Sequence, residues 1–205
     1  MNKKYLRVPY GLSVHGSQEI TAVVNVLKSS TQMGKNVSSF EKKIAKLFDK
    51  KYGLMVNSGS SALMLAIEAL ELPEGSEVIT PALTFSTTVG YLVRNKLIPV
   101  FVDVEEGTYC INENKIKNLI NKKTKAILAP HLMGNIVNWK KLYPMLKSKK
   151  IKIIEDSADT LGATYKGKST GHYADISITS FYGSHIINCA GNGGIVCFNN
   201  KKQYL

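Results

Sequence analysis

The chain has 205 residues, 44% of them hydrophobic, which is enough to bury the core of one full-sized domain. Lysine and arginine outnumber aspartate and glutamate by 27 to 15, so the formal net charge is +12. The basic residues are scattered along the chain without a nucleic-acid-binding signature around them. We therefore expect them to form solvated surface, and we do not expect a nucleic-acid partner.

Three cysteines, Cys110, Cys189 and Cys197, share no metal-ligand spacing, and an odd number does not make a disulfide framework. The first residues, MNKKYLRVPYG, lack the apolar core of a signal peptide. No apolar run approaches the roughly 20 residues that span a bilayer. The sequence therefore predicts a cytoplasmic protein with no membrane partner.

The first elements expected are an arm and two helices. Residues 1–16, with one proline and two glycines, are expected to form an extended N-terminal arm. Ser17 is expected to cap a helix whose apolar residues repeat with a period of 3.6 as far as Leu27. A second amphipathic helix is predicted over residues 37–48. Residues 17–205 are expected to form one domain, because no repeat or linker divides them.

The segment KYGLMVNSGSSALMLAIEAL predicts an anion-binding turn. It contains a predicted strand over residues 52–56, small residues over 57–61 and a predicted helix over 62–70. Unpaired backbone N–H groups and the positive end of the helix dipole converge at such a helix start, so a phosphate fits there. Serine-rich turns also cap helices without binding a ligand, and both interpretations stay open.

Short apolar strands and amphipathic helices then alternate along the chain. Strands are predicted over residues 77–79, 99–102, 126–128, 151–154, 176–179 and 195–198, and helices over 86–95, 112–121 and 138–148. This alternation predicts an α/β fold with a mostly parallel sheet and helices on both faces. Open sheets of this kind bind their ligands at the C-terminal ends of the strands.

Polar residues follow several of these predicted strands. Glu155 and Asp156 come directly after residues 151–154, and a polar cluster from Ser180 to His185 follows residues 176–179. His131 ends another predicted strand, where it could line a pocket, although a lone loop histidine is more often structural.

The segment IEDSADTLGATYKGKSTGHYADISITSFYGSH resembles the cofactor segment of the DegT/DnrJ/EryC1/StrS family. Members of this family are pyridoxal-phosphate-dependent enzymes that act on nucleotide-linked keto sugars. The resemblance implies an aspartate-aminotransferase-like large domain that binds pyridoxal 5′-phosphate or pyridoxamine 5′-phosphate. It covers nearly all of this chain but about the first half of the family, whose members continue through a second, smaller domain that this chain lacks.

The resemblance also implies roles for individual residues. Ser60, Ser61 and Ser180 match positions that bind the cofactor phosphate. Asp156 matches the carboxylate that keeps the pyridine nitrogen protonated, which turns the ring into an electron sink. The residue pattern alone favours Phe85 as a core aromatic, but Phe85 falls where the family stacks an aromatic ring on the pyridine, and the two together favour stacking on the cofactor.

One further position resembles the 3-dehydratase branch of the family. Asp159 falls where the aminotransferases carry Gln or His near the ring hydroxyl. Some dehydratases of this branch carry an iron–sulfur cluster, and Ala158 matches the position of one of its ligands. The remaining ligands would lie after Leu205, so no cluster or other metal is expected.

Position 185 separates two activities. In the family's aminotransferases the Schiff-base lysine comes five residues after the serine of the Ser-Phe pair, and counting from Ser180 gives His185. No lysine lies between Lys168 and Lys201. Imidazole has no primary amine, but it can act as a base near neutral pH. The dehydratase branch uses such a histidine with pyridoxamine phosphate, so the resemblance implies that His185 is the catalytic base.

Three functions stay open. The leading hypothesis is C3 dehydration of a nucleotide-linked 4-keto-6-deoxy sugar in deoxysugar and lipopolysaccharide O-antigen biosynthesis, by a homodimeric lyase with glutamate as amino donor. The second is a nucleotide-sugar aminotransferase of the same family. The third is a truncated, non-catalytic remnant or interaction module, suggested by the missing second half and by the turn at Gly191 to Gly194, which lacks the family's acidic residue.

Overall fold

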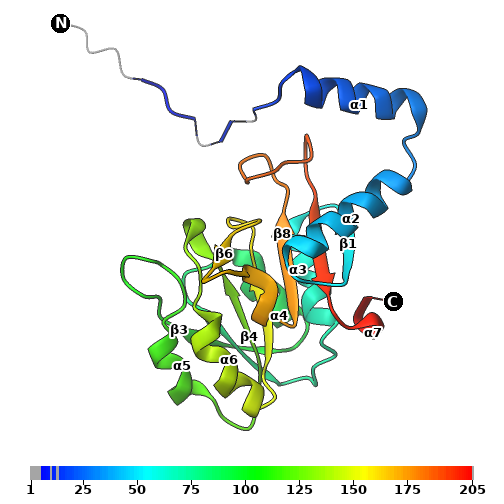
Figure 1. Cartoon of the computed structure of the whole chain (residues 1–205). Coiled ribbons are helices and arrows are strands. Elements are labelled where there is room, and N and C mark those ends of the chain that lie inside the picture. Colours follow the sequence, from blue (N-terminus) through cyan, green and yellow to red (C-terminus); the bar gives the residue numbers. More distant parts are fainter. Residues whose placement is uncertain (1–5, 10, 13, 205) are drawn as a thin grey trace, which may run out of the picture.

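The computed structural model describes residues 6–9, 11–12 and 14–204 (Figure 1). Seven strands form one sheet in the order β1-β9-β8-β5-β4-β2-β3. The pairs β3-β2, β2-β4, β4-β5 and β5-β8 are parallel, and β9 is antiparallel to both of its neighbours. The strands are β1 (Tyr52–Val56), β2 (Glu77–Pro81), β3 (Ile98–Val102), β4 (Thr124–Pro130), β5 (Lys152–Asp156), β8 (Ile176–Ser180) and β9 (Gly194–Phe198).

Helices follow most of the strands. The α-helices are α1 (Ser17–Ser29), α2 (Lys35–Leu47), α3 (Gly59–Glu68), α4 (Ser86–Arg94), α5 (Glu113–Leu119), α6 (Trp139–Ser148) and α7 (Lys201–Tyr204). Two short 3-10 helices, η1 (Leu132–Gly134) and η2 (Thr170–Tyr173), lie in the loops after β4 and before β8. Neither these two turns nor α7 were predicted from the sequence.

Helices cover both faces of the sheet because successive strand side chains point to opposite sides. On one face Leu128 and Ile154 pack in a cluster that includes α3 and α4. On the other face Ile127 and Ile153 pack with α5 and α6. The predicted α/β fold, with a mostly parallel sheet between two helical layers, is confirmed.

Helix α1 lies apart from the sheet and buries none of its residues (Figure 1). The predicted cap at Ser17 is wrong by one residue. Gly16 is the N-cap, and its N–H donates to Oε2 of Glu19 at 2.7 Å, which satisfies the helix start without a serine hydroxyl. The described residues before α1 form no helix or strand, and the rest of the predicted arm lies outside the described residues. None of the described helices is long and apolar enough to cross a membrane.

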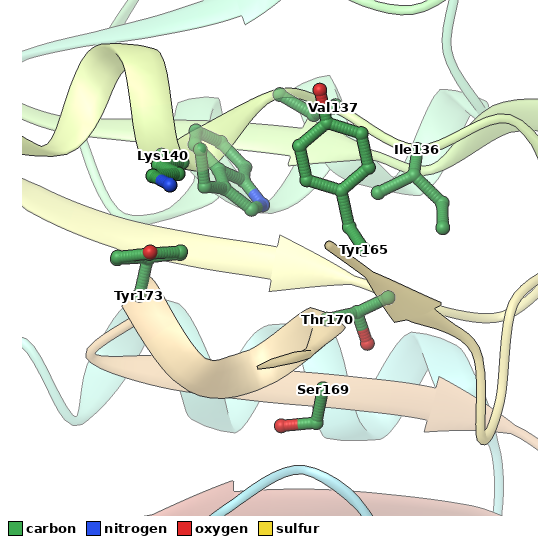
Figure 2. Close-up of a pocket in the computed structure, with 8 residues that line it drawn as sticks. Ile136, Val137, Lys140, Tyr165, Ser169, Thr170 and Tyr173 are labelled. Atoms are coloured by element: carbon green, nitrogen blue, oxygen red, sulfur yellow. The ribbon is translucent and has the colours of Figure 1, made fainter. Parts of the chain in front are cut away.

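Strands β6 (Thr164–Tyr165) and β7 (Lys168–Ser169) form a hairpin that was not predicted from the sequence. Tyr165 and Ser169 help to line a small cavity beside Trp139 (Figure 2). Its volume is about 10 Å³, which is room for one water molecule and no larger ligand. This cavity is therefore not the functional site.

Candidate functional site

The polar residues predicted to form a site meet at the C-terminal ends of the parallel strands. Asp156 is the last residue of β5 and Ser180 the last residue of the neighbouring strand β8. The N-terminus of α3 lies against the same edge, because β1 runs parallel to β8 on the far side of β9. This edge is where an open α/β sheet binds its ligands.

The start of α3 leaves two amides available for an anion. Ser58 is the N-cap, and its Oγ accepts a hydrogen bond from the N–H of Ser61 at 3.1 Å. The N–H of Ala62 donates to the carbonyl of Ser58. Within the part of the chain that the structure describes, the amides of Gly59 and Ser60 have no hydrogen-bond acceptor. They lie at the positive end of the helix dipole, which favours a phosphate there.

Gly59 brings this helix start into contact with Ser180. A Cβ atom at position 59 would lie 2.5 Å from Cβ of Ser180 and 2.9 Å from its Oγ, so only glycine fits there. The Ser180 side chain therefore lies against the start of α3, and we name its hydroxyl and the two amides the anion cradle. Sequence reasoning missed Ser58 and Gly59. The helix starts at Gly59 and not at Ala62, so the serine before the glycine was a readable cap signal.

The carboxyl group of Asp156 lies beside this cradle in a partly buried position. Its Oδ1 accepts a hydrogen bond from the N–H of Ala158 at 3.0 Å. Burial raises the pKa of Asp156 to about 6, and the neighbouring charges of Asp159 and Glu155 add to the rise. A positively charged group bound next to Asp156 would lower that pKa again. The position thus suits a protonated ring nitrogen.

Asp159 and His185 face each other across the site. Oδ2 of Asp159 accepts a hydrogen bond from the N–H of Met133 at 2.9 Å, and its Oδ1 lies 3.9 Å from Nε2 of His185. The Nδ1 atom of His185 has no hydrogen-bond partner among the described residues. The backbone N–H of His185 donates to the carbonyl of Tyr182 at 3.0 Å, which turns the loop back toward β8.

Phe85 precedes α4, in the loop that follows β2, and is 68% exposed. The alternative interpretation of Phe85 as a core aromatic is therefore wrong. An exposed ring after a parallel strand is free to contact a ligand, and its stacking on a cofactor stays a prediction.

His131 and Glu155 do not face the site. Glu155 is fully buried and alternates with Asp156, so its side chain points to the opposite face of the sheet. There its carboxylate lies 3.6 Å from Nε2 of His131, which is 1% exposed. The suggestion that His131 could line the pocket is wrong, and its structural interpretation is confirmed. The acidic pair contributes only Asp156 to the site.

The N-terminal arm crosses the loop that carries His185. Nε2 of His15 lies 2.9 Å from Oδ1 of Asn188. Gly11 approaches Ser184 so closely that a Cβ at position 11 would lie 2.9 Å from its Cβ. The described part of the arm therefore covers one side of this loop. Among the described residues, no group of three or more His, Cys, Asp or Glu side chains could hold a metal ion.

Comparison with known proteins agrees with this geometry. The sequence model of the DegT/DnrJ/EryC1/StrS aminotransferase family matches residues 14–204. A dTDP-4-dehydro-2,6-dideoxy-D-glucose 3-dehydratase from Saccharopolyspora spinosa is 36% identical over 92% of this chain and 42% of its own length. A GDP-perosamine synthase from Escherichia coli O157:H7 is also 36% identical, over 98% of this chain and 55% of its own.

A solved structure shares the whole fold of the chain. The E. coli GDP-4-keto-6-deoxy-D-mannose-3-dehydratase with bound hydrated PLP superposes with a TM-score of 0.91 at 33% identity, and covers 97% of this chain and 52% of its own. The aspartate-aminotransferase-like fold and the pyridoxal phosphate cofactor implied by the resemblance agree with this neighbour. The chain spans about half the length of the relatives it matches.

Proposed function

Because this chain belongs to the DegT/DnrJ/EryC1/StrS aminotransferase family, we propose that it forms the cofactor-binding domain of a nucleotide-sugar 3-dehydratase. The substrate is a nucleotide-linked 4-keto-6-deoxy sugar, and the product enters deoxysugar or O-antigen assembly. One observation carries the proposal. A histidine, His185, faces Asp159 at the position where the aminotransferases of the resembled family hold their cofactor by a lysine.

The site fits pyridoxal or pyridoxamine phosphate. The anion cradle consists of the amides of Gly59 and Ser60 and the hydroxyl of Ser180. All three groups can donate hydrogen bonds, which suits a phosphate. The Asp156 carboxyl group lies beside the cradle, and the exposed ring of Phe85 is available to stack. When bound, the cofactor supplies an electron sink for a carbanion next to its methylene carbon.

The Asp156 carboxylate would keep the cofactor ring nitrogen protonated. Its raised pKa of about 6 leaves it ionised at neutral pH, and a cationic ring nearby strengthens that ionisation. The Ser180 hydroxyl and the first amides of α3 bind the phosphate, and Ser61, whose N–H is used by the Ser58 cap, offers only its hydroxyl. Phe85 would exclude water from one face of the cofactor ring.

His185 moves the proton. In the neutral ring with its proton on Nε2, which faces Asp159, the lone pair lies on Nδ1, a buried atom with no hydrogen-bond partner among the described residues. With the cofactor and substrate bound, the imidazole of His185 would act as the base that takes a proton at the cofactor methylene and would then return a proton to the leaving C3 hydroxyl. The carboxylate of Asp159 lies 3.9 Å from Nε2, on the side of the ring away from Nδ1.

A nucleotide-sugar aminotransferase is the second candidate, since a GDP-perosamine synthase is among the relatives. This activity requires a lysine at the site. Lys50 is buried, and its Nζ donates to the carbonyls of Gly171 and Ala174. That amine is therefore engaged away from the cradle, which favours the dehydratase. Glutamate as amino donor and a homodimeric assembly belong to the same proposal.

The proposal is tested with the protein in its natural length, pyridoxamine phosphate, glutamate and GDP- or dTDP-linked 4-keto-6-deoxyhexose. We expect a nucleotide sugar that has lost its C3 hydroxyl, together with free ammonia, by mass spectrometry. An amino sugar that keeps the C3 hydroxyl would establish the aminotransferase instead. Absence of cofactor binding in an absorbance titration would favour the non-catalytic remnant.

A further inference from the structure

A buried histidine closes the loop between β4 and α6. Nδ1 of His131 accepts a hydrogen bond from the N–H of Val137 at 2.9 Å. A backbone N–H can only donate, so Nδ1 holds a lone pair and the proton of the neutral ring lies on Nε2. The bond fastens the end of this loop to its beginning.

The other side of the ring is held by a buried carboxylate. Nε2 of His131 lies 3.6 Å from Oε2 of Glu155, and both side chains are fully buried. The hydroxyl of Ser157 donates to the second oxygen, Oε1, at 2.6 Å. Burial alone would raise the pKa of Glu155, but His131, Ser157 and Lys50 outweigh burial and lower it. The anionic partner fixes the ring so that Nδ1 faces Val137.

The loop between these anchors needs such a fastening. Met133 has φ of 55° and Gly134 has φ of 82°. The left-handed region is unfavourable for a residue other than glycine. The side chain of Met133 is 72% exposed, so its burial does not offset that cost. What Met133 contributes is its N–H, which donates to Oδ2 of Asp159 at 2.9 Å.

We infer that His131 is a positioning residue, which holds Val137 and thereby fixes the Met133 amide that orients Asp159 toward His185. The inference deepens the proposed function and rests on it, because the oriented carboxylate is the one beside the proposed base. His131 itself touches neither the cradle nor His185. It acts from the opposite face of the sheet, through the backbone of one loop.

Two substitutions of His131 test the bond to Val137 and the contact with Glu155 separately. In His131→Asn the amide oxygen takes the place of Nδ1, so the bond to Val137 is kept and the contact with Glu155 is lost. In His131→Gln the longer side chain reaches Glu155 but has no acceptor at the place of Nδ1. Amide hydrogen exchange of Met133 in the cofactor-free protein reports the loop directly, and it needs neither cofactor nor turnover.

We expect the Met133 amide to exchange about tenfold faster in His131→Gln, as the loss of one hydrogen bond implies. In His131→Asn it should exchange within about threefold of the wild-type rate. The amides of Ile127 and Leu128 in β4 serve as the internal control. Equal acceleration of these core amides would mean general destabilisation and would overturn the inference. Equal Met133 rates in the two variants would overturn it as well.

The catalytic consequence is measured separately. If the dehydratase reaction is found, His131→Gln should lower kcat about tenfold with KM little changed, and His131→Asn should restore it. A normal kcat in His131→Gln would overturn the link to His185. If no dehydration occurs in the wild type, the proposed function fails, and the exchange experiment still decides whether His131 orders the loop.

Discussion

Oδ1 of Asp159 lies 3.9 Å from Nε2 of His185, although the two residues come from loops on different strands. The contact joins the end of β5 to the loop after β8. It places a negative charge beside the only histidine that the site holds among the described residues. This pairing of a carboxylate with a histidine distinguishes the site from one built around a lysine.

Replacing His185 by Asn should abolish dehydration and leave cofactor binding unchanged. The loss of a positioned base costs about 10²- to 10⁴-fold in rate, and the cradle at Gly59 and Ser180 is untouched. Turnover and an absorbance titration with pyridoxal phosphate measure the two effects. His172→Asn is the matched control, because His172 pairs with Asp49 at 2.7 Å on the surface. Equal activity of the two variants would refute the role of His185.

Replacing Gly59 by Ala should weaken cofactor binding about 10- to 100-fold, since a methyl group would push the start of α3 away from Ser180. The affinity for pyridoxal phosphate is measured by absorbance or fluorescence. Gly90→Ala is the control, because a Cβ at Gly90 meets no atom within 4 Å. That variant should bind normally and gain up to about 1 kcal/mol of helix stability. Normal binding by Gly59→Ala would show that the cradle does not hold the phosphate.

Asp156 should make the cofactor-free protein less stable as the pH rises. Its pKa is raised in the folded state from 3.8 to about 6, so the folded state binds the proton more tightly than the unfolded state. The protonated Asp156 stabilises the folded state by at most about 3 kcal/mol. This contribution is fully present below pH 4 and is lost as the pH rises through 6. Urea unfolding at pH 4.5 and 7.5 should show a larger fall for the wild type than for Asp156→Asn. The same fall in both proteins would contradict the raised pKa.

Replacing Asp159 by Asn should lower the pKa of Asp156, because the Asp159 charge is one cause of its rise. The amide oxygen of Asn still accepts the hydrogen bond from Met133, so the loop should keep its structure. We expect the pH midpoint of the stability change to move down and dehydration to slow about tenfold. Unfolding curves across pH and turnover measure the two effects. An unmoved midpoint would mean that the two carboxylates do not interact.

The strands and the helices could be predicted because local patterns encode them. The apolar runs at β1, β5 and β8 are bounded by turn residues, and each strand lies where its run predicted. The hairpin β6–β7 also had a signal in Lys166-Gly167, both of which have positive φ, but its strands are too short for a hydrophobic period.

Other features depend on residues that are far apart in the chain. The antiparallel direction of β9, the contact between Gly59 and Ser180 and the burial of His131 against Glu155 each require the folded sheet. The positions of Ser60, Asp156 and Ser180 at one edge followed from the sheet order, whereas their chemical roles came from the resemblance. Those roles remain predictions.

The central claim is that His185 takes the proton from the cofactor methylene carbon. Pyridoxamine phosphate deuterated at that carbon, supplied with the keto sugar substrate, tests it directly. The wild type should release methylene deuterium to the solvent during turnover, and His185→Asn should release it at least about 100-fold more slowly. Release at the wild-type rate from His185→Asn would contradict the account.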